Sequence, residues 1–234
     1  MLVAKTHSPV IPHPSPNHNA RKTGIDMLVL HYTNMPDATS ALARMCDPSA
    51  EASAHYLIGK DGRIFQMVDE SRRAWHAGIS CWLGESDINS RSIGIELDNS
   101  GNQPFPEVQM ATLEELARNI IARHAISKGR VLGHSDVAPL RKQDPGKWFD
   151  WARLAKAGTG LWPEEETFTI SVPDPAEEAC RLLAAIGYGY VEESSETILL
   201  AFQQHFLPGH RSGKPDEKTI ARLRQVLALI EKNR

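Results

Sequence analysis

The chain has 234 residues, of which 41% are hydrophobic and 24% charged, which is enough apolar material for one large domain or for an average domain with a smaller one. A formal net charge of −3 favours neither nucleic acid nor an anionic membrane as the main partner. The three cysteines are odd in number and widely spaced, which argues against a disulfide framework and against a thiolate metal site.

The beginning of the chain shows no regular pattern. Residues 1–24 contain four prolines and little to bury, so we expect an irregular N-terminal arm. The arm lacks the apolar segment of a secretory signal, and the chain has no run of about 18 apolar residues that would span a membrane. These absences predict a cytoplasmic protein, with a processed periplasmic or cell-wall protein as the alternative.

The first predicted core strand covers residues 27–33, which are rich in aliphatic side chains. Because side chains alternate along a strand, His31 lies on the face opposite to Leu28 and Leu30. His31 is also near the carboxyl end of the strand, where open α/β sheets tend to bind ligands. A short helix should follow over residues 37–46.

A hairpin is predicted next. Two strand-like runs, residues 54–60 and 63–68, are joined by Asp61 and Gly62, a dipeptide typical of tight hairpin turns. Residues 74–89 are rich in Trp and Gly and have no periodicity, so we expect a long loop, and loops of this length are usually functional when they are ordered.

A second apolar strand, residues 92–98, carries a carboxylate at its centre. Glu96 is on the face opposite to the one formed by Ile93, Ile95 and Leu97, and burying its charge is costly unless something pairs with it. A long amphipathic helix should follow from Pro106 to about residue 127.

The most informative stretch is residues 132–146. A short apolar run ends at His134, and the Pro- and Gly-broken segment after it contains Asp136, Lys142 and Asp144. Polar groups on a loop held by a buried strand are where catalytic residues concentrate.

The rest of the chain predicts a separate helical unit. After a short helix over residues 148–157, residues 161–175 have the Pro, Gly and Glu content of a linker. Three helical patterns follow, at residues 176–186, 195–206 and 216–231, and together they predict a small three-helix unit over 176–234 that packs on, or is tethered to, a first domain over 25–160.

These residues favour a catalytic zinc site. Hydrolytic zinc takes three protein ligands from His, Asp, Glu or Cys and leaves a fourth position for water, and His31, His134 and Asp144 would supply the three. Glu96 is then the natural general base and later proton donor to the leaving amine. Lys142 could stabilise the oxyanion of a tetrahedral intermediate.

Each of these assignments has a plainer alternative. His31 could be a core histidine with satisfied hydrogen bonds, and Glu96 could simply pair with Arg91. Lys142 could be a solvated loop charge, which is what we expect of the neighbouring Arg141. Asp136 could orient His134 or Lys142 as a hydrogen-bond partner, or it could cap its own loop. Expected contacts with a peptide substrate are Asn34, Trp75, His76, Ala77 and Arg91.

Five motifs occur in order and together carry a family resemblance. They are Leu-His-Tyr-Thr at 30–33, Ser-Ala-His-Tyr at 53–56, Trp-His-Ala-Gly at 75–78, Ser-Ile-Gly-Ile-Glu at 92–96 and Gly-His-Ser-Asp-Val-Ala-Pro-Leu-Arg-Lys-Gln-Asp-Pro-Gly at 133–146. Over about residues 15–163 the chain resembles the zinc-dependent N-acetylmuramoyl-L-alanine amidases.

The resemblance implies zinc on His31, His134 and Asp144, with catalytic roles for Glu96 and Lys142. It implies an α/β fold with a mixed central sheet flanked by helices. The reaction would be hydrolysis of the amide between N-acetylmuramic acid and L-alanine of the stem peptide. Members with Asp as the third ligand include cytosolic recycling amidases that act on anhydro-muropeptides, and we expect a monomer of this branch with muropeptides as its partners.

The C-terminal unit resembles the small helical peptidoglycan-binding domain that often follows such amidases. The glycine-rich turn usual in that domain is degraded here to Pro-Gly-His-Arg-Ser-Gly at 208–213, so the unit could merely shape the active-site cleft. Two rival functions remain: a protein of the same fold that binds peptidoglycan without cleaving it, and a zinc hydrolase acting on another amide.

Overall fold

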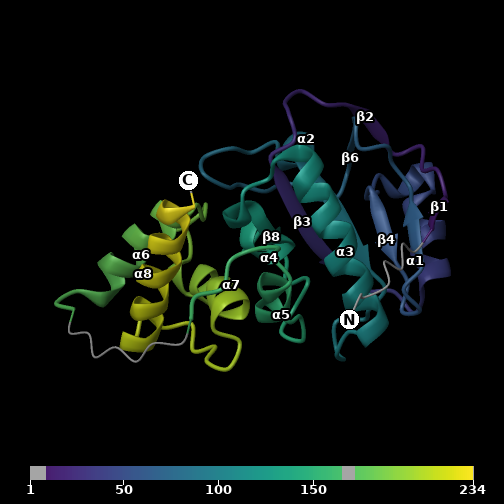
Figure 1. Ribbon diagram of the computed structural model, residues 1–234. Coiled ribbons are helices and arrows are strands. Elements are labelled where there is room, and N and C mark those ends of the chain that lie inside the picture. The colour runs from purple at the N-terminus through teal and green to yellow at the C-terminus, as the bar shows by residue number, and fades with distance from the viewer. Residues whose placement is uncertain (1–8, 165–171, 234) are drawn as a thin grey trace.

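The computed structural model describes residues 9–164 and 172–233, and its elements are labelled in Figure 1. The strands are β1 (Val10–Pro12), β2 (His18–Ala20), β3 (Met27–Tyr32), β4 (Tyr56–Ile58), β5 (Ile64–Gln66), β6 (Arg72–Ala74), β7 (Ser92–Leu97) and β8 (Val131–Gly133). The helices are α1 (Ala38–Met45), α2 (Ile88–Arg91), α3 (Glu107–His124), α4 (His134–Val137), α5 (Trp151–Lys156), α6 (Pro175–Ile186), α7 (Ser195–Phe206) and α8 (Glu217–Lys232), with short 3-10 helices η1 (Pro48–Ala50) and η2 (Lys128–Arg130).

The central sheet has six strands in the order β1-β5-β4-β7-β3-β8. Only the β4–β5 pair is antiparallel, and it forms the hairpin that the Asp-Gly turn predicts. The other pairs are parallel, so this is a mixed sheet, and β2 and β6 form a separate antiparallel pair. Helices flank the sheet (Figure 1), and the expected α/β class is therefore confirmed.

One face of the sheet is covered by α3. Leu28 and Leu30 of β3 and the apolar residues of β7 pack against Leu113 and Ile120 of α3, in the alternation that the sequence predicts. Each of these side chains is fully buried, and the buried members of this cluster come from residues 28–154.

The opposite face of β3 and β8 is covered by the C-terminal helices. Met27, Val29 and Leu132 belong to the same buried cluster as Leu183 of α6 and Phe202 of α7. In Figure 1 these helices lie beside α4, α5 and β8. The three predicted helices are thus present and pack together, and they share a continuous hydrophobic core with the sheet.

The prediction of an irregular N-terminal arm is wrong for residues 10–12 and 18–20. The first segment pairs with β5 as an edge strand, and the second pairs with β6. Buried polar side chains tie the arm to neighbouring loops: Asn17 Nδ2 donates to the carbonyl oxygens of Asp47 and Ala52 at 2.8 and 2.9 Å. Strands that are held by backbone pairing and by buried polar side chains have no apolar periodicity. The sequence pattern therefore did not predict these two strands.

Most predicted helices begin and end within about three residues of their expected limits. Asp37 caps α1 through a 2.8 Å bond from the Ser40 amide to its carboxylate, and Asp174 caps α6 in the same way. Residues 165–171 of the predicted linker, and residues 1–8 of the arm, lie outside the described residues. Within residues 9–164 and 172–233, no helix has the length and apolar character needed to cross a membrane, and the cytoplasmic location stays a prediction.

Candidate metal centre and active-site cavity

Three parallel strands bring the candidate site residues to one edge of the sheet. In the β3–β7 register, His31 lies directly beside Glu96, and in the β3–β8 register Leu30 lies beside Gly133. Because His134 follows Gly133 at once, all three side chains lie near the carboxyl ends of adjacent strands. The sheet register thus joins residues that are 103 positions apart in sequence, namely His31 and His134.

Gly133 allows the segment that carries Asp144 to fold back onto β8. A Cβ atom at position 133 would lie only 2.7 Å from Pro145 Cδ, so any larger residue would push Pro145 away. The Ser135 amide also donates to the Asp144 carbonyl at 2.8 Å. These contacts place the Asp144 carboxylate beside His134, although ten residues separate them.

His31, His134 and Asp144 form one buried group. The Nδ1 atoms of the two imidazoles are 2.9 Å apart, and Asp144 Oδ2 is 2.9 Å from His31 Nδ1 and 3.0 Å from His134 Nδ1. The three residues are between 1% and 7% exposed, and together they form a group that could hold a metal ion.

The electrostatics of the group suit metal binding. Burial, and then the nearby His134, lower the pKa of His31 to about 4, so its imidazole is neutral at pH 7. Burial would raise the pKa of Asp144, but the hydrogen bond with His134 holds that pKa well below its usual range. The group therefore offers the neutral imidazole of His31 and the ionised carboxylate of Asp144, the forms that bind metals.

The outer nitrogen of His134 faces the backbone. His134 Nε2 lies 3.1 Å from the Ala77 carbonyl oxygen, which can only accept, so Nε2 can donate there when Nδ1 binds a metal ion. Nδ1, which lies beside Asp144, would be the metal-binding nitrogen. The donor atoms are about 0.3 Å closer than the roughly 3.3 Å separation that bonds of about 2.0–2.1 Å give in a tetrahedral site. A small outward shift would therefore fit a metal ion.

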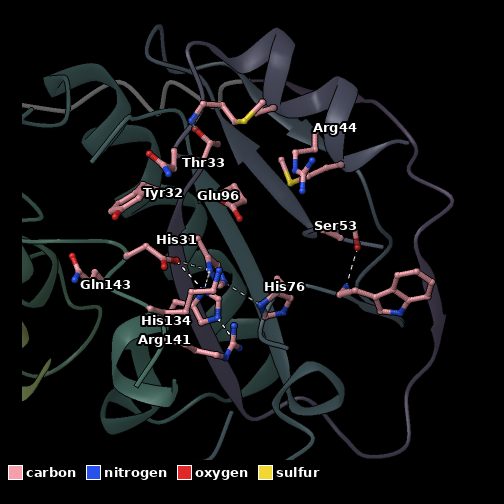
Figure 2. Close-up of a pocket in the computed structure, with 18 of the residues that line it drawn as sticks. His31, Tyr32, Thr33, Arg44, Ser53, His76, Glu96, His134, Arg141 and Gln143 are labelled. Atoms are coloured by element: carbon pink, nitrogen blue, oxygen red, sulfur yellow. Dashed lines mark hydrogen bonds and ion pairs between the residues drawn. The ribbon is translucent and has the colours of Figure 1, made fainter. Parts of the chain in front are cut away.

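The candidate metal group forms part of the wall of a cavity of about 750 Å³. Figure 2 shows His31 and His134 together with Glu96 above them, and Lys142 lines the same cavity. Burial, and then the Asp144 charge, raise the pKa of Glu96 to about 8, while the Lys142 ammonium opposes the rise. Among the described residues, Glu96 Oε2 has no hydrogen-bond partner, so it is free to meet a substrate or water.

The structure brings some of the expected substrate contacts to the cavity and not others. Asn34, Trp75 and His76 line it. Ala77 is fully buried, and its contribution is the carbonyl that accepts from His134. Arg91 is absent from the described lining of the cavity and forms ion pairs with Asp26 and Glu85, so its guanidinium neither faces substrate nor neutralises Glu96.

Arg141 is a site residue that the sequence analysis missed. Arg141 is exposed, as expected of a solvated charge, but its guanidinium also donates to the Ile79 carbonyl at 2.7 Å and to the Ala77 carbonyl. Arg141 thereby connects the loop of Lys142 to the loop that holds His134 Nε2. Its partners are 62 and 64 residues away in sequence, so no local pattern could have indicated them.

Asp136 caps its own loop, as one of the alternatives had it, but it also has two partners that the sequence did not predict. Its Oδ2 accepts from the Gly133 amide at 2.7 Å. The same carboxylate lies 2.7 Å from His205 Nδ1 and accepts from the Tyr188 hydroxyl at 2.7 Å. Both partners belong to the C-terminal part of the chain, so that part contacts the turn that carries His134.

Comparison with known proteins agrees with this geometry. A family model described as N-acetylmuramoyl-L-alanine amidase matches residues 20–147. N-acetylmuramoyl-L-alanine amidase AmiD of Escherichia coli (strain K12) is 39% identical over 89% of this chain and 83% of that protein.

Two solved structures have a similar fold over nearly the whole chain. One is AmiD from E. coli in complex with the substrate anhydro-N-acetylmuramic acid-L-Ala-D-gamma-Glu-L-Lys, with a TM-score of 0.79 and 36% identity over 90% of this chain and 92% of that chain. The other is AmpDh3 from Pseudomonas aeruginosa in complex with anhydromuramic pentapeptide, with a TM-score of 0.80 and 29% identity over 98% of this chain and 99% of that chain.

A mixed α/β sheet that ends in a buried group able to hold a metal, beside a carboxylic acid in a large cavity, is typical of metal-dependent hydrolases. Within that class, the chain belongs to the N-acetylmuramoyl-L-alanine amidase family. The resemblance drawn from the sequence motifs is thereby confirmed, and the non-enzymatic alternative is not favoured.

Proposed function

We propose that this amidase is a zinc enzyme that cleaves muropeptides between the lactyl group of anhydro-N-acetylmuramic acid and the amino group of L-alanine. His31, His134 and Asp144 would hold the zinc. The observation that carries the proposal is the convergence of these three donors on one point of a cavity that also contains an unpartnered carboxyl group. Complexes of the relatives with anhydromuramyl peptides support this substrate class.

Zinc bound at this group would supply Lewis-acid polarisation of the scissile carbonyl and of the attacking water. Glu96 takes a proton from that water as the water oxygen bonds to the carbonyl carbon. The same carboxyl group then returns the proton to the amide nitrogen as the carbon–nitrogen bond breaks. The products are the lactyl carboxylic acid and the free amino group of the peptide. The pKa of Glu96 is about 8 in the metal-free chain, and the positive charge of a bound zinc ion would lower it.

Lys142 has a different role in this proposal. Its ammonium lines the cavity, and its positive charge lowers the pKa of both Glu96 and His31, which shows that its field reaches both groups. An ammonium so placed stabilises the negative oxygen that develops on the scissile carbonyl. The cavity is large enough for a sugar with several peptide residues, and Asn34 and Trp75 on its wall are the proposed peptide contacts.

The test separates metal binding from catalysis. Glu96→Gln should retain stoichiometric zinc and lose about 10²–10⁴-fold in kcat on anhydro-N-acetylmuramic acid-L-Ala-D-gamma-Glu-L-Lys, with peptide release followed by mass spectrometry. Asp144→Ala should lose most of its zinc. Arg91→Gln is a matched control, because this residue lies outside the described cavity wall, and it should retain both activity and metal.

Two results would overturn the proposal. If Glu96→Gln kept full activity, Glu96 would have no catalytic role. If Asp144→Ala retained stoichiometric zinc, this residue would not be a ligand. Comparing release from anhydro-muropeptides with release from intact sacculi then distinguishes recycling of wall fragments from remodelling of the wall, and we expect the anhydro-muropeptide to be cleaved faster.

The C-terminal helices have a part in this proposal that differs from glycan binding. Thr197 of α7 lines the catalytic cavity, and Gln204 of α7 donates to the Gln143 carbonyl at 2.7 Å, one residue before Asp144. We therefore propose that α6–α8 shape the cleft, while binding of peptidoglycan by these helices stays a prediction.

A further inference from the structure

His76 contacts the candidate metal group from outside. Its Nδ1 lies 3.0 Å from His31 Nε2, the ring nitrogen that faces away from His134 and Asp144. The two rings meet edge to face, with their centroids 5.0 Å apart. Figure 2 shows His76 beside His31. His76 is itself buried, with 8% of its surface exposed.

Ser92 and Ile88, on the side of His76 away from His31, determine which nitrogen of His76 carries the proton. The carbonyl oxygen of Ile88 can only accept, and Ser92 Oγ lies 2.6 Å from it, so the single hydroxyl proton of Ser92 is donated there. Ser92 Oγ is also 3.2 Å from His76 Nε2, and it can only accept in this second contact. His76 must therefore carry its proton on Nε2.

The same logic continues to His31. His76 is buried and neither of its ring nitrogens faces a carboxylate, so the ring packs in its neutral form with one proton. With that proton on Nε2, His76 Nδ1 is an acceptor, and His31 Nε2 must donate to it. His31 Nδ1 is left as a lone pair that faces Asp144 and His134, which is the form required of a metal ligand.

The surrounding chain is built to hold the His76 ring in place. A Cβ atom at position 94 would lie 2.5 Å from His76 Cγ, so the ring occupies space that only a glycine on β7 leaves open. Asn89 Oδ1 accepts from the backbone amides of His76 and Ala77 at 3.0 and 2.8 Å. Gly94 thus leaves the space that the ring fills, and Asn89 fixes the backbone that carries the ring.

We propose that His76 is a positioning residue that fixes the tautomer and ring orientation of His31 through the hydrogen-bonded chain Ile88–Ser92–His76–His31. This inference rests on the zinc site proposed above and revises the expectation that His76 is a substrate contact. Partners that orient a metal-binding histidine in this way are typically worth about 10- to 100-fold in metal affinity.

The test compares three substitutions by their zinc dissociation constants, measured by competition with a chromogenic chelator on protein from which metal has been removed. His76→Phe keeps a ring of similar size but removes the acceptor, so it should weaken zinc binding about 10- to 100-fold. His76→Asn places a carboxamide near the position of Nδ1 and should stay within about fivefold of the unsubstituted chain. Ser92→Ala leaves the His76 ring but releases its tautomer, and it should weaken binding about two- to fivefold.

Two further readouts separate positioning from other roles. Nitrogen-15 NMR of the imidazoles in the metal-free chain should show His31 protonated on Nε2, and Ser92→Ala should give a mixture of tautomers. With zinc saturating, KM for the muropeptide should change less than about threefold in His76→Phe. A raised KM with unchanged zinc affinity would make His76 a substrate contact and would overturn the inference.

The outcomes also distinguish this inference from the proposed function. If the unsubstituted chain binds zinc and cleaves muropeptide while a folded His76→Phe binds zinc equally well, only the inference fails. If the unsubstituted chain binds no zinc, the proposed function fails first. Thermal unfolding of the metal-free variants checks folding, and if His76→Phe does not fold, wild-type zinc affinity together with a wild-type tautomer in Ser92→Ala overturns the inference.

Discussion

The two halves of the candidate metal centre are supported from different parts of the chain. His31 is held from within the amidase-like part, by its strand β3 and by His76 lying on β7. The loop that carries His134 and Asp144 is held from the C-terminal helices, through Asp136 and through Gln204. One half thus depends on the sheet, and the other depends on helices attached more than forty residues later in the sequence.

The C-terminal helices therefore belong to the active site in a structural sense. Buried Met27 and Val29 share a cluster with Phe202, so the sheet itself is incomplete without these helices. A small accessory domain on a flexible tether would leave such apolar residues exposed to water.

Deleting residues 172–234 should have the largest effect. The deletion exposes the apolar face of β3 and β8 and removes both C-terminal partners of Asp136. We expect a loss of more than about 5 kcal/mol, comparable with the whole stability of a typical domain, so the fragment should show no cooperative thermal transition by circular dichroism. A fragment that melts cooperatively and binds zinc like the full chain would show that the sheet supports both halves of the centre.

Asp136→Ala should be next in size. The substitution leaves the Gly133 amide, the Tyr188 hydroxyl and His205 without their shared acceptor, in a place where only 1% of Asp136 is exposed. Stability measured by urea unfolding should fall by about 3 kcal/mol. Asp61→Ala is the control, because this carboxylate is exposed and pairs only with Arg63. Equal losses of stability in the two variants would contradict the role of Asp136 as a shared buried acceptor.

Glu96→Gln changes the cavity wall beside His31, and its effect on stability should depend on pH. In the metal-free chain the pKa of Glu96 is raised from 4.5 to about 8, so ionisation of Glu96 destabilises the folded state as pH rises through this interval. The substitution should therefore have little effect on stability at pH 4.5 and should stabilise the chain progressively, by on the order of 1–3 kcal/mol at pH 9. Thermal unfolding across this range measures it, and a stabilisation that shrinks as pH rises would contradict the assignment.

Gln204→Ala should have the smallest effect. Its amide donates to the Gln143 carbonyl at 2.7 Å from a partly exposed position, so we expect a loss of about 1 kcal/mol or less in stability. Zinc affinity should fall about two- to fivefold, because the loop of Asp144 becomes less restrained. Glu196→Ala, an exposed change on the same helix, is the control and should alter neither quantity.

Much of the site could be predicted because strand alternation is a local property. The period of two placed His31 and Glu96 on the face opposite to the aliphatic residues, and parallel pairing then set them side by side. The end of a short apolar run at His134 also indicated where a buried strand emerges. Both features depend only on residues that are neighbours in sequence, so they can be read before the fold is known.

The parts that could not be predicted depend on contacts between distant segments. Asp136 and His205 are 69 residues apart, and the Tyr188 hydroxyl reaches Asp136 across 52 residues. Strand β1 forms because the edge strand β5 offers unpaired backbone groups, and β2 forms by pairing with β6; no side-chain pattern records either pairing. Arg91 was expected at the substrate because arginine suits carboxylates, but Asp26 and Glu85 already satisfy that preference.

The position of Thr197 on the cavity wall has a consequence for how this enzyme could acquire a new preference for its substrate. Substitutions of Thr197 would reshape that wall while leaving the contacts of α7 with Asp136 and Gln143 in place. Selection on the length or branching of the stem peptide could therefore act on the C-terminal helices, and variants that differ only there would be expected to process different wall fragments at the same chemical centre.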